Sequence, residues 1–383
     1  MKKLLYLALW NVVGEIQACG VSQKVFTQAR AFVKLGYQTD VVMRSGNTFL
    51  LYHFPSEENE QWEMQVSKMW PQRKFFYKDV EEKLDLSSYD AFYIRYQLCD
   101  YYFWKLLRTI KRTKKNAAKV VSEIPTFPYA DECKGSRKKE VLYLQDQLFA
   151  PRLKRCIDRF VIYGDQQQIY GIPTICTQNG VDVDAYPVRC GVTPEPGVIR
   201  LVGIASATAA HGYDRLLRGI AEYKNAYPDG CKFKVCIIGD GAKLAAYKEL
   251  VREEDLEKEV FFAGRQPKSK LYEFLQNSDI GINALGDYRI GLNTTSSLKS
   301  REYLAYGLPF ISASNVSGVA PDFPWILKVP NEDGALDMNE VVAFHSKICR
   351  AGADHVAAEL HQHAKENVDI VRVLKCVVDF LDS

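Results

Sequence analysis

The sequence predicts an α/β protein made of two successive doubly wound parallel sheets. Strand-length apolar runs alternate with amphipathic helical segments along the chain, which is typical of strand–helix–strand units. Proline and glycine become frequent at 187–197, and the alternation then starts again. With 383 residues, of which 47% are hydrophobic, the chain is long enough for two domains with substantial cores.

The first half begins with the apolar run KLLYLALW, which predicts a buried strand over 3–10. A basic start before an apolar run also suggests a secretory signal, but this run is short and polar residues follow it. Residues 22–36 have helical spacing of apolar side chains and end at a glycine. Residues 48–88 show no clear period. Further strands are predicted at 37–44, 90–96, 120–125 and 159–164, and helices at 101–116 and 137–156.

The second half continues the alternation. Strands are predicted at 199–205, 233–239, 260–264, 280–285 and 309–314, and helices at 213–227, 243–252, 268–277, 297–306 and beyond 338. We therefore expect one domain over 1–190 and another over 191–365, and the final helix, 366–383, is a candidate to complete the first. Ligand sites in such sheets lie at the carboxyl ends of the strands, so we expect the active site in the cleft between the two domains.

The segment LNTTSSLKSREYLAYGLPF, residues 292–310, has an unusual helix start. Ser296 or Ser297 can cap the helix, and Gly307 suits the left-handed position that closes it. Lys299 falls in the first turn, where the helix dipole disfavours a cation unless an anion is near. The arrangement therefore predicts that a phosphate binds at this helix start.

Glu302 lies on the same helix face as Lys299, and a carboxylate can accept two hydrogen bonds from a ribose diol. One short helix can thus hold both ends of a nucleoside diphosphate. The alternative is an ordinary ion pair between Lys299 and Glu302 on a solvated surface.

The segment SSLKSREYLAYGLPFI resembles the donor-binding segment of family 4 glycosyltransferases, which are retaining enzymes with the GT-B fold. Other segments resemble the same family in the same order, over the C-terminal half and parts of the N-terminal half. They are GVSQKVFTQARAFVKLGYQTDVV, NGVD (179–182), HGYDRLLRGIAEY (211–223), FKVCIIGDGAKLAAYKEL and VFFAGRQPKSKLYEFLQNSDIGI.

The resemblance implies that the C-terminal domain binds a UDP- or GDP-sugar and that the N-terminal domain binds the acceptor. It also implies that no metal is needed, because helix N-termini and basic side chains neutralise the diphosphate. His211 can donate a hydrogen bond to the phosphate and Lys299 can supply a cation, so both are candidate catalytic residues. The residues that it implies for donor binding are Gly20, Gly239, Asp240, Gly241, Arg265, Thr294, Thr295, Ser297, Leu298, Lys299 and Glu302.

The sequence departs from the family's pattern at two places. Thr294 stands where the family has the first glutamate of Glu-x7-Glu, so Thr295 and Ser297 are left to offer hydroxyls to the donor sugar. Ile204 and His211 stand nearest to the positions of the family's usual arginine and lysine. A catalytically degenerate homologue that acts as a partner subunit is therefore one alternative, and a GT-B nucleotide-sugar epimerase is another.

Several further features have both a functional and an ordinary interpretation. Gly239-Asp240-Gly241 is a tight turn that can approach a ligand or simply join a strand to a helix. Gly14 and Gly20 flank the first loop in the same ambiguous way. Glu123 ends a predicted strand, where it can orient or deprotonate an acceptor hydroxyl or serve as a structural carboxylate.

Composition and charge limit the partners and the location. Ten scattered cysteines without a CxxC pair argue against a zinc ribbon, and no GxGxxG motif follows the first strand, which argues against a dehydrogenase. The net charge of +3 requires no nucleic acid. Segment 101–119 carries basic residues three and four apart, which can contact an anionic membrane or face water.

Together these features predict a retaining hexosyltransferase that acts on a saccharide or lipid-linked saccharide in cell-surface polysaccharide or glycolipid assembly. No run approaches the roughly 20 apolar residues of a membrane span. We therefore expect a cytoplasmic protein at the inner face of the plasma membrane.

Overall fold

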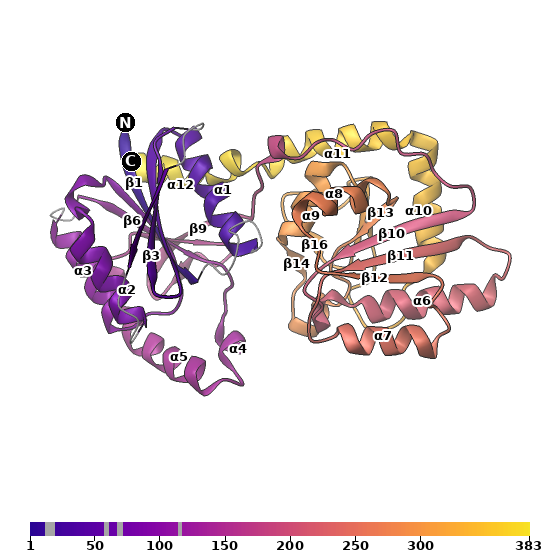
Figure 1. Ribbon diagram of the computed structural model, residues 1–383, viewed down its shortest axis with the longest axis horizontal. Helices are drawn as coiled ribbons and strands as arrows, with labels where there is room; N and C mark the ends of the chain where they lie inside the picture. Colours follow the sequence, from indigo (N-terminus) through magenta and orange to yellow (C-terminus); the bar gives the residue numbers. More distant parts are fainter. Residues whose placement is uncertain (12–19, 57–60, 67–71, 114–116) are drawn as a thin grey trace. The chain divides into compact units, whose positions relative to one another are not determined.

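The computed structural model describes residues 1–11, 20–56, 61–66, 72–113 and 117–383. Contacts divide the chain into two compact units, Met1–Gln178 with Ile370–Ser383, and Asn179–Asp369 (Figure 1). The predicted α/β fold with parallel, Rossmann-like sheets is confirmed. The expected boundary at 190 lies inside the second unit, because the Arg189 backbone N–H donates to the Tyr306 carbonyl at 3.0 Å.

The first unit is built on one large sheet. Its strands in the described residues follow the order β4-β3-β2-β1-β5-β6-β7-β9-β8. The strands are β1 Lys2–Asn11, β2 Tyr37–Ser45, β3 Thr48–Phe54, β4 Gln61–Val66, β5 Ala91–Arg95, β6 Lys119–Ile124, β7 Arg159–Ile162, β8 Gln168–Ile169 and β9 Ile172–Cys176. β1 pairs in parallel with both β2 and β5, so it is an interior strand of the sheet.

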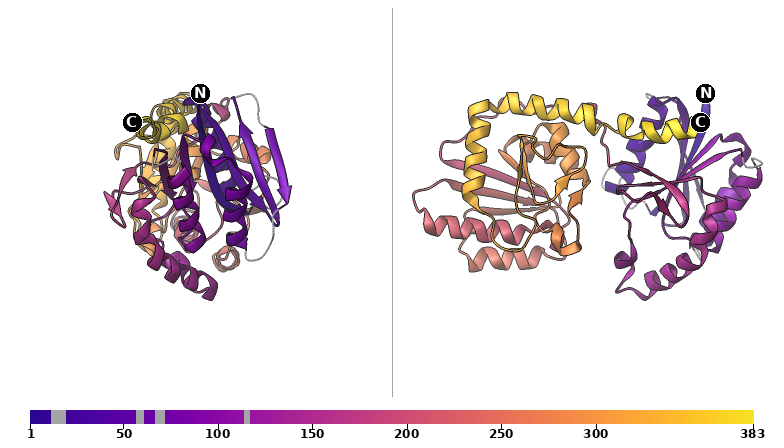
Figure 2. Two further views of the ribbon diagram at one scale, coloured as in Figure 1. Left: turned by 90° about the vertical axis from the view of Figure 1, so that its left-hand side faces the viewer. Right: turned by 180° about the vertical axis from the view of Figure 1, so that it is seen from behind.

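Both faces of this sheet are covered, which explains why β1 is apolar along its length. Leu5 and Leu7 enter one core, and Leu4 and Tyr6 enter the core on the opposite face. Helices α1 and α12 cover the second face, whereas α2, α3 and η3 cover the first (Figure 2). The helical elements of the unit are α1 Gly20–Lys34, α2 Gln72–Lys83, η2 Leu86–Ser88, α3 Tyr101–Thr113, α4 Ala130–Cys133, α5 Arg137–Phe149, η3 Ala150–Arg155 and α12 Ile370–Asp382.

Two regions differ from the prediction. Residues 48–54 and 61–66 form an antiparallel extension of the sheet edge, because β3 pairs with β2 and β4 pairs with β3. The helix expected over 137–156 is α-helical only to Phe149 and continues as the 3-10 turn η3. Pro151 lacks the backbone N–H that an α-helix would need there, so the helix tightens at this point.

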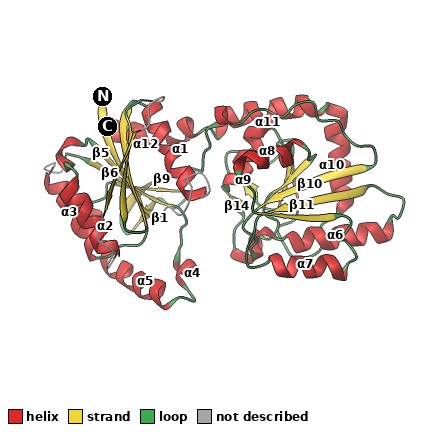
Figure 3. Cartoon of the chain, in the orientation of Figure 1, coloured by secondary structure: helices red, strands yellow, loops and turns green. Residues whose placement is uncertain are grey.

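The second unit has a sheet with the order β12-β11-β10-β13-β15-β17 in the described residues (Figure 3). Helices α6 and α7 lie on one face, and α8, α9 and α11 lie on the other. The strands are β10 Val198–Ile204, β11 Lys232–Ile238, β12 Val260–Gly264, β13 Ile280–Ile282, β15 Phe310–Ser312 and β17 Ile326–Lys328, and β14 Thr294–Thr295 pairs with β16 Asn315–Val316. The helical elements are η4 Val183–Ala185, η5 Ala209–His211, α6 Tyr213–Ala226, α7 Leu244–Glu253, α8 Lys268–Gln276, η6 Asp287–Ile290, α9 Leu298–Tyr306, α10 Met338–Ala351 and α11 Ala353–Asn367.

Each sheet has a point at which the strand order reverses. In the second unit the chain runs from β10 outward to β12 and then returns to add β13 on the other side of β10. In the first unit β1 is flanked in the same way by β2 and β5. Such switch points open a crevice at the carboxyl ends of the strands, where ligands bind in this class of fold.

Candidate functional site

The switch point of the second unit is formed by the loop after β10 and the segment after β13. The first loop ends in His211, and the second segment leads through β14 to the start of α9. Asn283, directly after β13, is buried and accepts a hydrogen bond from the Ser297 hydroxyl at 2.9 Å. This contact ties the beginning of α9 to the carboxyl end of the central strands.

The start of α9 has the predicted geometry. Ser297 is the N-cap, and its hydroxyl accepts the Ser300 backbone N–H at 3.3 Å. Gly307 closes the helix with φ 81°, as the sequence predicts, and its position against Ala357 leaves no room for a side chain. Ser297 therefore fixes where the unpaired N–H groups and the positive dipole end of α9 lie.

Lys299 is the most unusual side chain of this site. Its Nζ atom is buried and has no hydrogen-bond partner among the described residues. Burial lowers the pKa of the amine to about 7, and the nearby Asp287 carboxylate only partly opposes that shift. A buried ammonium without a partner is costly, so the site is electrostatically incomplete without an anion.

His211 lies beside Lys299. Burial, together with the Lys299 charge, lowers the pKa of the imidazole to about 3. The Thr208 backbone N–H donates to Nδ1 at 3.1 Å, so the neutral ring carries its proton on Nε2. His211 is thus a neutral hydrogen-bond donor.

Glu302 lies one turn further along α9. Tyr186 donates its hydroxyl to Glu302 Oε1 at 3.0 Å, and burial beside this carboxylate raises the pKa of Tyr186. Glu302 is partly exposed and makes no ion pair with Lys299 among the described residues, so the surface-pair alternative does not hold. Tyr186 orients the carboxylate and was not found by sequence reasoning.

Arg301 is a second residue that sequence reasoning missed. It is fully buried and donates to the Asn179 and Ser317 carbonyls at 3.1 and 2.7 Å. Asn179 also donates its backbone N–H to Ser296 at 2.7 Å. The NGVD segment is therefore anchored to the start of α9, which gives this motif a positioning role within the second unit.

The glycines of the site allow loops to pack closely. A Cβ on Gly239 would meet the Ala205 carbonyl oxygen at 1.9 Å, and one on Gly241 would meet Ala207 backbone atoms at 2.5 Å. The Asp240 carboxylate accepts the Gly241 N–H at 2.7 Å. The GDG turn thus packs tightly against the loop after β10 and supports that loop.

The other residues that were predicted to bind the sugar donor lie on several different elements. Thr294 is exposed on β14 and Thr295 is buried there, so neither belongs to α9. Leu298 packs against the core. Arg265 is exposed after the edge strand β12. Gly20 is exposed at the start of α1 in the first unit. Gly14 of the first loop and Lys115 of the basic segment 101–119 fall outside the described residues.

The first unit has a pocket of about 540 Å³ at its own switch point. Trp10 follows the apolar part of β1, and Arg44 lies near the end of β2. Trp10 Nε1 and Arg44 Nε are buried donors with no hydrogen-bond partner among the described residues. The lining residues are Leu9, Trp10, Arg44, Arg73, Arg95, Tyr96, Gln97, Leu98, Ile124, Pro125, Thr126, Tyr129, Cys133, Lys139 and Leu142.

Glu123 contacts Arg95, which lines this pocket, and is completely buried. Its carboxylate accepts hydrogen bonds from Lys24 at 3.0 Å, Arg95 at 2.9 Å, Gln28 at 2.6 Å and Tyr93 at 2.7 Å. Although burial alone would raise it, the Lys24 and Arg95 charges bring the pKa of Glu123 down to about 2. The Glu123 carboxylate therefore holds Arg95 in place and is not suited to remove a proton from an acceptor.

In the described part of the chain, no helix has the length and apolar character that crossing a bilayer requires.

Comparisons with known proteins agree with this description of the fold. Sucrose-phosphate synthase from Thermosynechococcus elongatus has a TM-score of 0.63 at 12% identity, over 100% of this chain and 99% of that chain. A Rickettsia africae glycosyltransferase has a TM-score of 0.63 at 14% identity, over 99% and 97%. Anabaena HepE in complex with UDP-glucose has a TM-score of 0.59 at 13% identity, over 100% of both chains.

The sequence itself matches more locally. No curated protein matches the chain. These structural neighbours are GT-B glycosyltransferases, and the likeness shows that the chain shares their α/β fold of parallel, Rossmann-like sheets. Residues 198–321, which contain His211, Lys299 and Glu302 but not Tyr186 or Asn179, match the family model of glycosyl transferases group 1.

Proposed function

We propose that the protein is a retaining glycosyltransferase that takes a hexose from a UDP- or GDP-sugar. The observation that carries this proposal is the buried, unpartnered ammonium of Lys299 at the capped start of α9, beside the switch point of the second unit. An anionic diphosphate supplies the missing partner. The family match over the same residues, and the UDP-glucose in complex with HepE, support a nucleotide sugar as that anion.

In this proposal the phosphates accept hydrogen bonds from Lys299, from the Nε2–H of His211 and from the N–H groups of α9. Glu302, held by Tyr186, accepts the ribose hydroxyls. Departure of the nucleoside diphosphate increases negative charge on the phosphate, and donors already in place there stabilise the transition state. Because these groups neutralise the diphosphate, we propose that transfer needs no metal.

We propose the pocket of the first unit as the acceptor site. Its apolar and aromatic walls suit a sugar ring, and its unpartnered Trp10 and Arg44 donors suit hydroxyl or phosphate oxygens. The departing phosphate can take the acceptor's proton, so a buried Glu123 with a low pKa is consistent with this mechanism. An acceptor of this kind fits a saccharide or lipid-linked saccharide used in cell-surface polysaccharide or glycolipid assembly, at an anionic membrane that 101–119 contacts.

The Lys299→Met variant tests this function. It removes the charge and keeps the length of the side chain, so we expect the Kd for UDP or GDP to rise about 10- to 100-fold, in line with a charged hydrogen bond of about 1.5–3 kcal/mol. The fold should be kept or stabilised, because an unpaired buried charge is removed. Calorimetric titration with UDP-, GDP- and ADP-sugars measures the affinity, and Lys258→Met on the exposed surface is the control.

Binding of no nucleotide by the wild-type protein would refute the proposal and favour a degenerate partner subunit. Nucleotide affinity that is equal in wild type and Lys299→Met would place the diphosphate elsewhere. A changed UDP-sugar without any acceptor would indicate an epimerase.

A further inference from the structure

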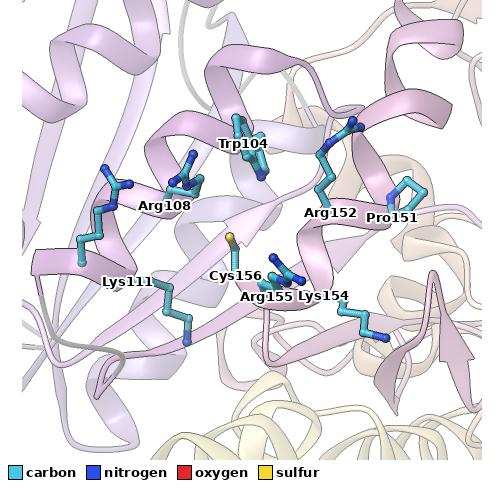
Figure 4. Close-up of a pocket in the computed structure, with 9 residues that line it drawn as sticks. Trp104, Arg108, Lys111, Pro151, Arg152, Lys154, Arg155 and Cys156 are labelled. Carbon is cyan, nitrogen blue, oxygen red and sulfur yellow. The ribbon is translucent and has the colours of Figure 1, made fainter.

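A second pocket in the first unit, of about 750 Å³, is lined mainly by cations (Figure 4). It lies between the C-terminal half of α3 and η3, two elements that are far apart in sequence. The basic lining residues are Arg108, Lys111, Arg112, Arg152, Lys154 and Arg155, and Trp104, Pro151 and Cys156 complete the wall.

Only one of these cations has its charge balanced by a carboxylate in the described residues. Lys111 is buried and pairs with Asp158 at 2.8 Å. The other five are exposed. Arg108, for example, lies over the Trp104 ring at 4.8 Å and not beside a carboxylate of the described residues. Like charges gathered around one cavity repel one another, so a bound anion would stabilise the arrangement.

An exposed apolar face lies directly beside this pocket. Val141, Leu144 and Leu148, spaced three and four residues apart on α5, are 56%, 67% and 60% exposed. The next residue, Phe149, packs against Trp104 with ring centroids 6.1 Å apart, and Arg152 lies over the Phe149 ring at 5.3 Å. The apolar face of α5 therefore runs to the edge of the cationic pocket.

We propose that the apolar face of α5 and the α3–η3 pocket form one docking surface for an anionic phospholipid bilayer. The pocket takes a headgroup phosphate, and the three apolar side chains of α5 enter the boundary with the acyl chains. Charge complementarity selects this partner: a free phosphate would satisfy the cations but would leave the leucines in water.

This surface deepens the membrane contact proposed above and does not depend on sugar transfer. It differs from the stripe over 101–119 that the sequence suggests. Of that stripe, Lys105 contacts Glu81 at 3.4 Å and Lys119 lies over the Phe380 ring. The proposed surface keeps Arg108 and Arg112 of that stripe and adds α5 and η3, which contribute the apolar side chains and half of the cations.

The experiment is co-sedimentation of the full chain with vesicles of phosphatidylcholine, alone or mixed with phosphatidylglycerol. We expect binding to the mixed vesicles only. The Arg112→Gln/Arg155→Gln variant should partition about thirtyfold more weakly, since one cation near an anionic surface contributes about fivefold. The Leu144→Ser/Leu148→Ser variant should partition about tenfold more weakly. Arg218→Gln/Lys258→Gln and Phe261→Ser, at exposed positions of the second unit, are the matched controls.

Equal binding of all variants, or equal binding to neutral vesicles, would overturn the proposal. Loss of binding in the arginine variant alone, with the leucine variant unchanged and inorganic pyrophosphate competing, would show a site for a soluble anion instead. The wild-type protein should also leave the vesicles as salt is raised, which tests the charge contribution without any variant. Titration of each variant with UDP tests nucleotide binding separately, so that failure of the membrane proposal can be distinguished from failure of the proposed sugar transfer.

Discussion

At the scale of single residues, the candidate site depends on a lysine whose environment favours the neutral form. Because the pKa of Lys299 is lowered from 10.5 to about 7, its charged form is disfavoured in the folded protein. Between about pH 7 and 10.5 the unfolded chain still binds the lysine proton that the folded protein has lost. The ligand-free protein therefore gains stability as the pH rises through this interval. A diphosphate would reverse this preference by stabilising the ammonium.

That reversal can be measured as proton uptake. Above pH 7 we expect nucleotide binding to raise the pKa of Lys299, so that binding at pH 8 takes up as much as about one proton. At pH 6 the uptake should vanish, because the amine is already charged. Calorimetry of UDP binding in two buffers with different ionisation enthalpies measures it, and uptake that persists in Lys299→Met would assign the proton to another group.

Glu123 is the corresponding buried charge of the first unit. Its pKa is lowered from 4.5 to about 2, so it contributes stability above pH 4.5 that is lost as the pH falls through about 2. Replacing it leaves Lys24 and Arg95 without their counter-charge.

We therefore expect Glu123→Gln to lower the free energy of unfolding by about 3–5 kcal/mol at pH 7, as for other broken buried pairs. Urea unfolding measures the loss, and the Glu123→Gln/Lys24→Met double variant should recover part of it. A variant that unfolds like the wild type but has lost turnover would instead indicate a direct role in proton transfer.

At the scale of elements, the loop after β10 is fixed by glycine contacts. Gly212 has φ 62°, and a Cβ there would meet the Gly286 nitrogen at 2.5 Å. Gly264 has nearly the same φ, 64°, but an added Cβ would meet nothing within 4 Å. A side chain at Gly264 would therefore meet backbone strain alone, whereas one at Gly212 would meet both backbone strain and a steric clash.

Gly264→Ala should cost about 1–2 kcal/mol, the ordinary penalty of the left-handed conformation. Gly212→Ala should cost clearly more, and it should also weaken UDP binding, because the adjacent His211 would be displaced. Thermal unfolding and nucleotide titration of the two variants give the comparison. Equal effects would mean that the loop after β10 adapts freely and does not hold His211 in place.

At the scale of the whole molecule, the chain ends in the unit where it begins. Helix α12 packs in the same core as α1 and β1, and Asp382 accepts hydrogen bonds from Lys2 and Tyr37 at 2.8 and 2.7 Å. Leu374 of α12 and Leu360 of α11 are both buried, but they belong to the cores of different units.

Leu374→Ala should therefore destabilise the first unit by about 2–5 kcal/mol, and Leu360→Ala should do the same to the second. UDP should raise the unfolding temperature of the second unit in both variants. Calorimetry with and without UDP assigns each transition. A single transition shifted equally by both substitutions would show that the two units unfold together.

The sequence by itself determined the alternation of strands and helices, the capped helix at Ser297 and its closing Gly307, because these depend on local periodicity and turn chemistry. Only the tertiary structure decided that Lys299 is buried, that Tyr186 and Arg301 support α9, and that Glu123 lies in an ion-pair network. Burial and partners come from residues far apart in the chain, such as Glu123 with Lys24, and no local pattern encodes them. Strands β3 and β4 escaped prediction for the same reason, since their pairing, and not their periodicity, makes them strands.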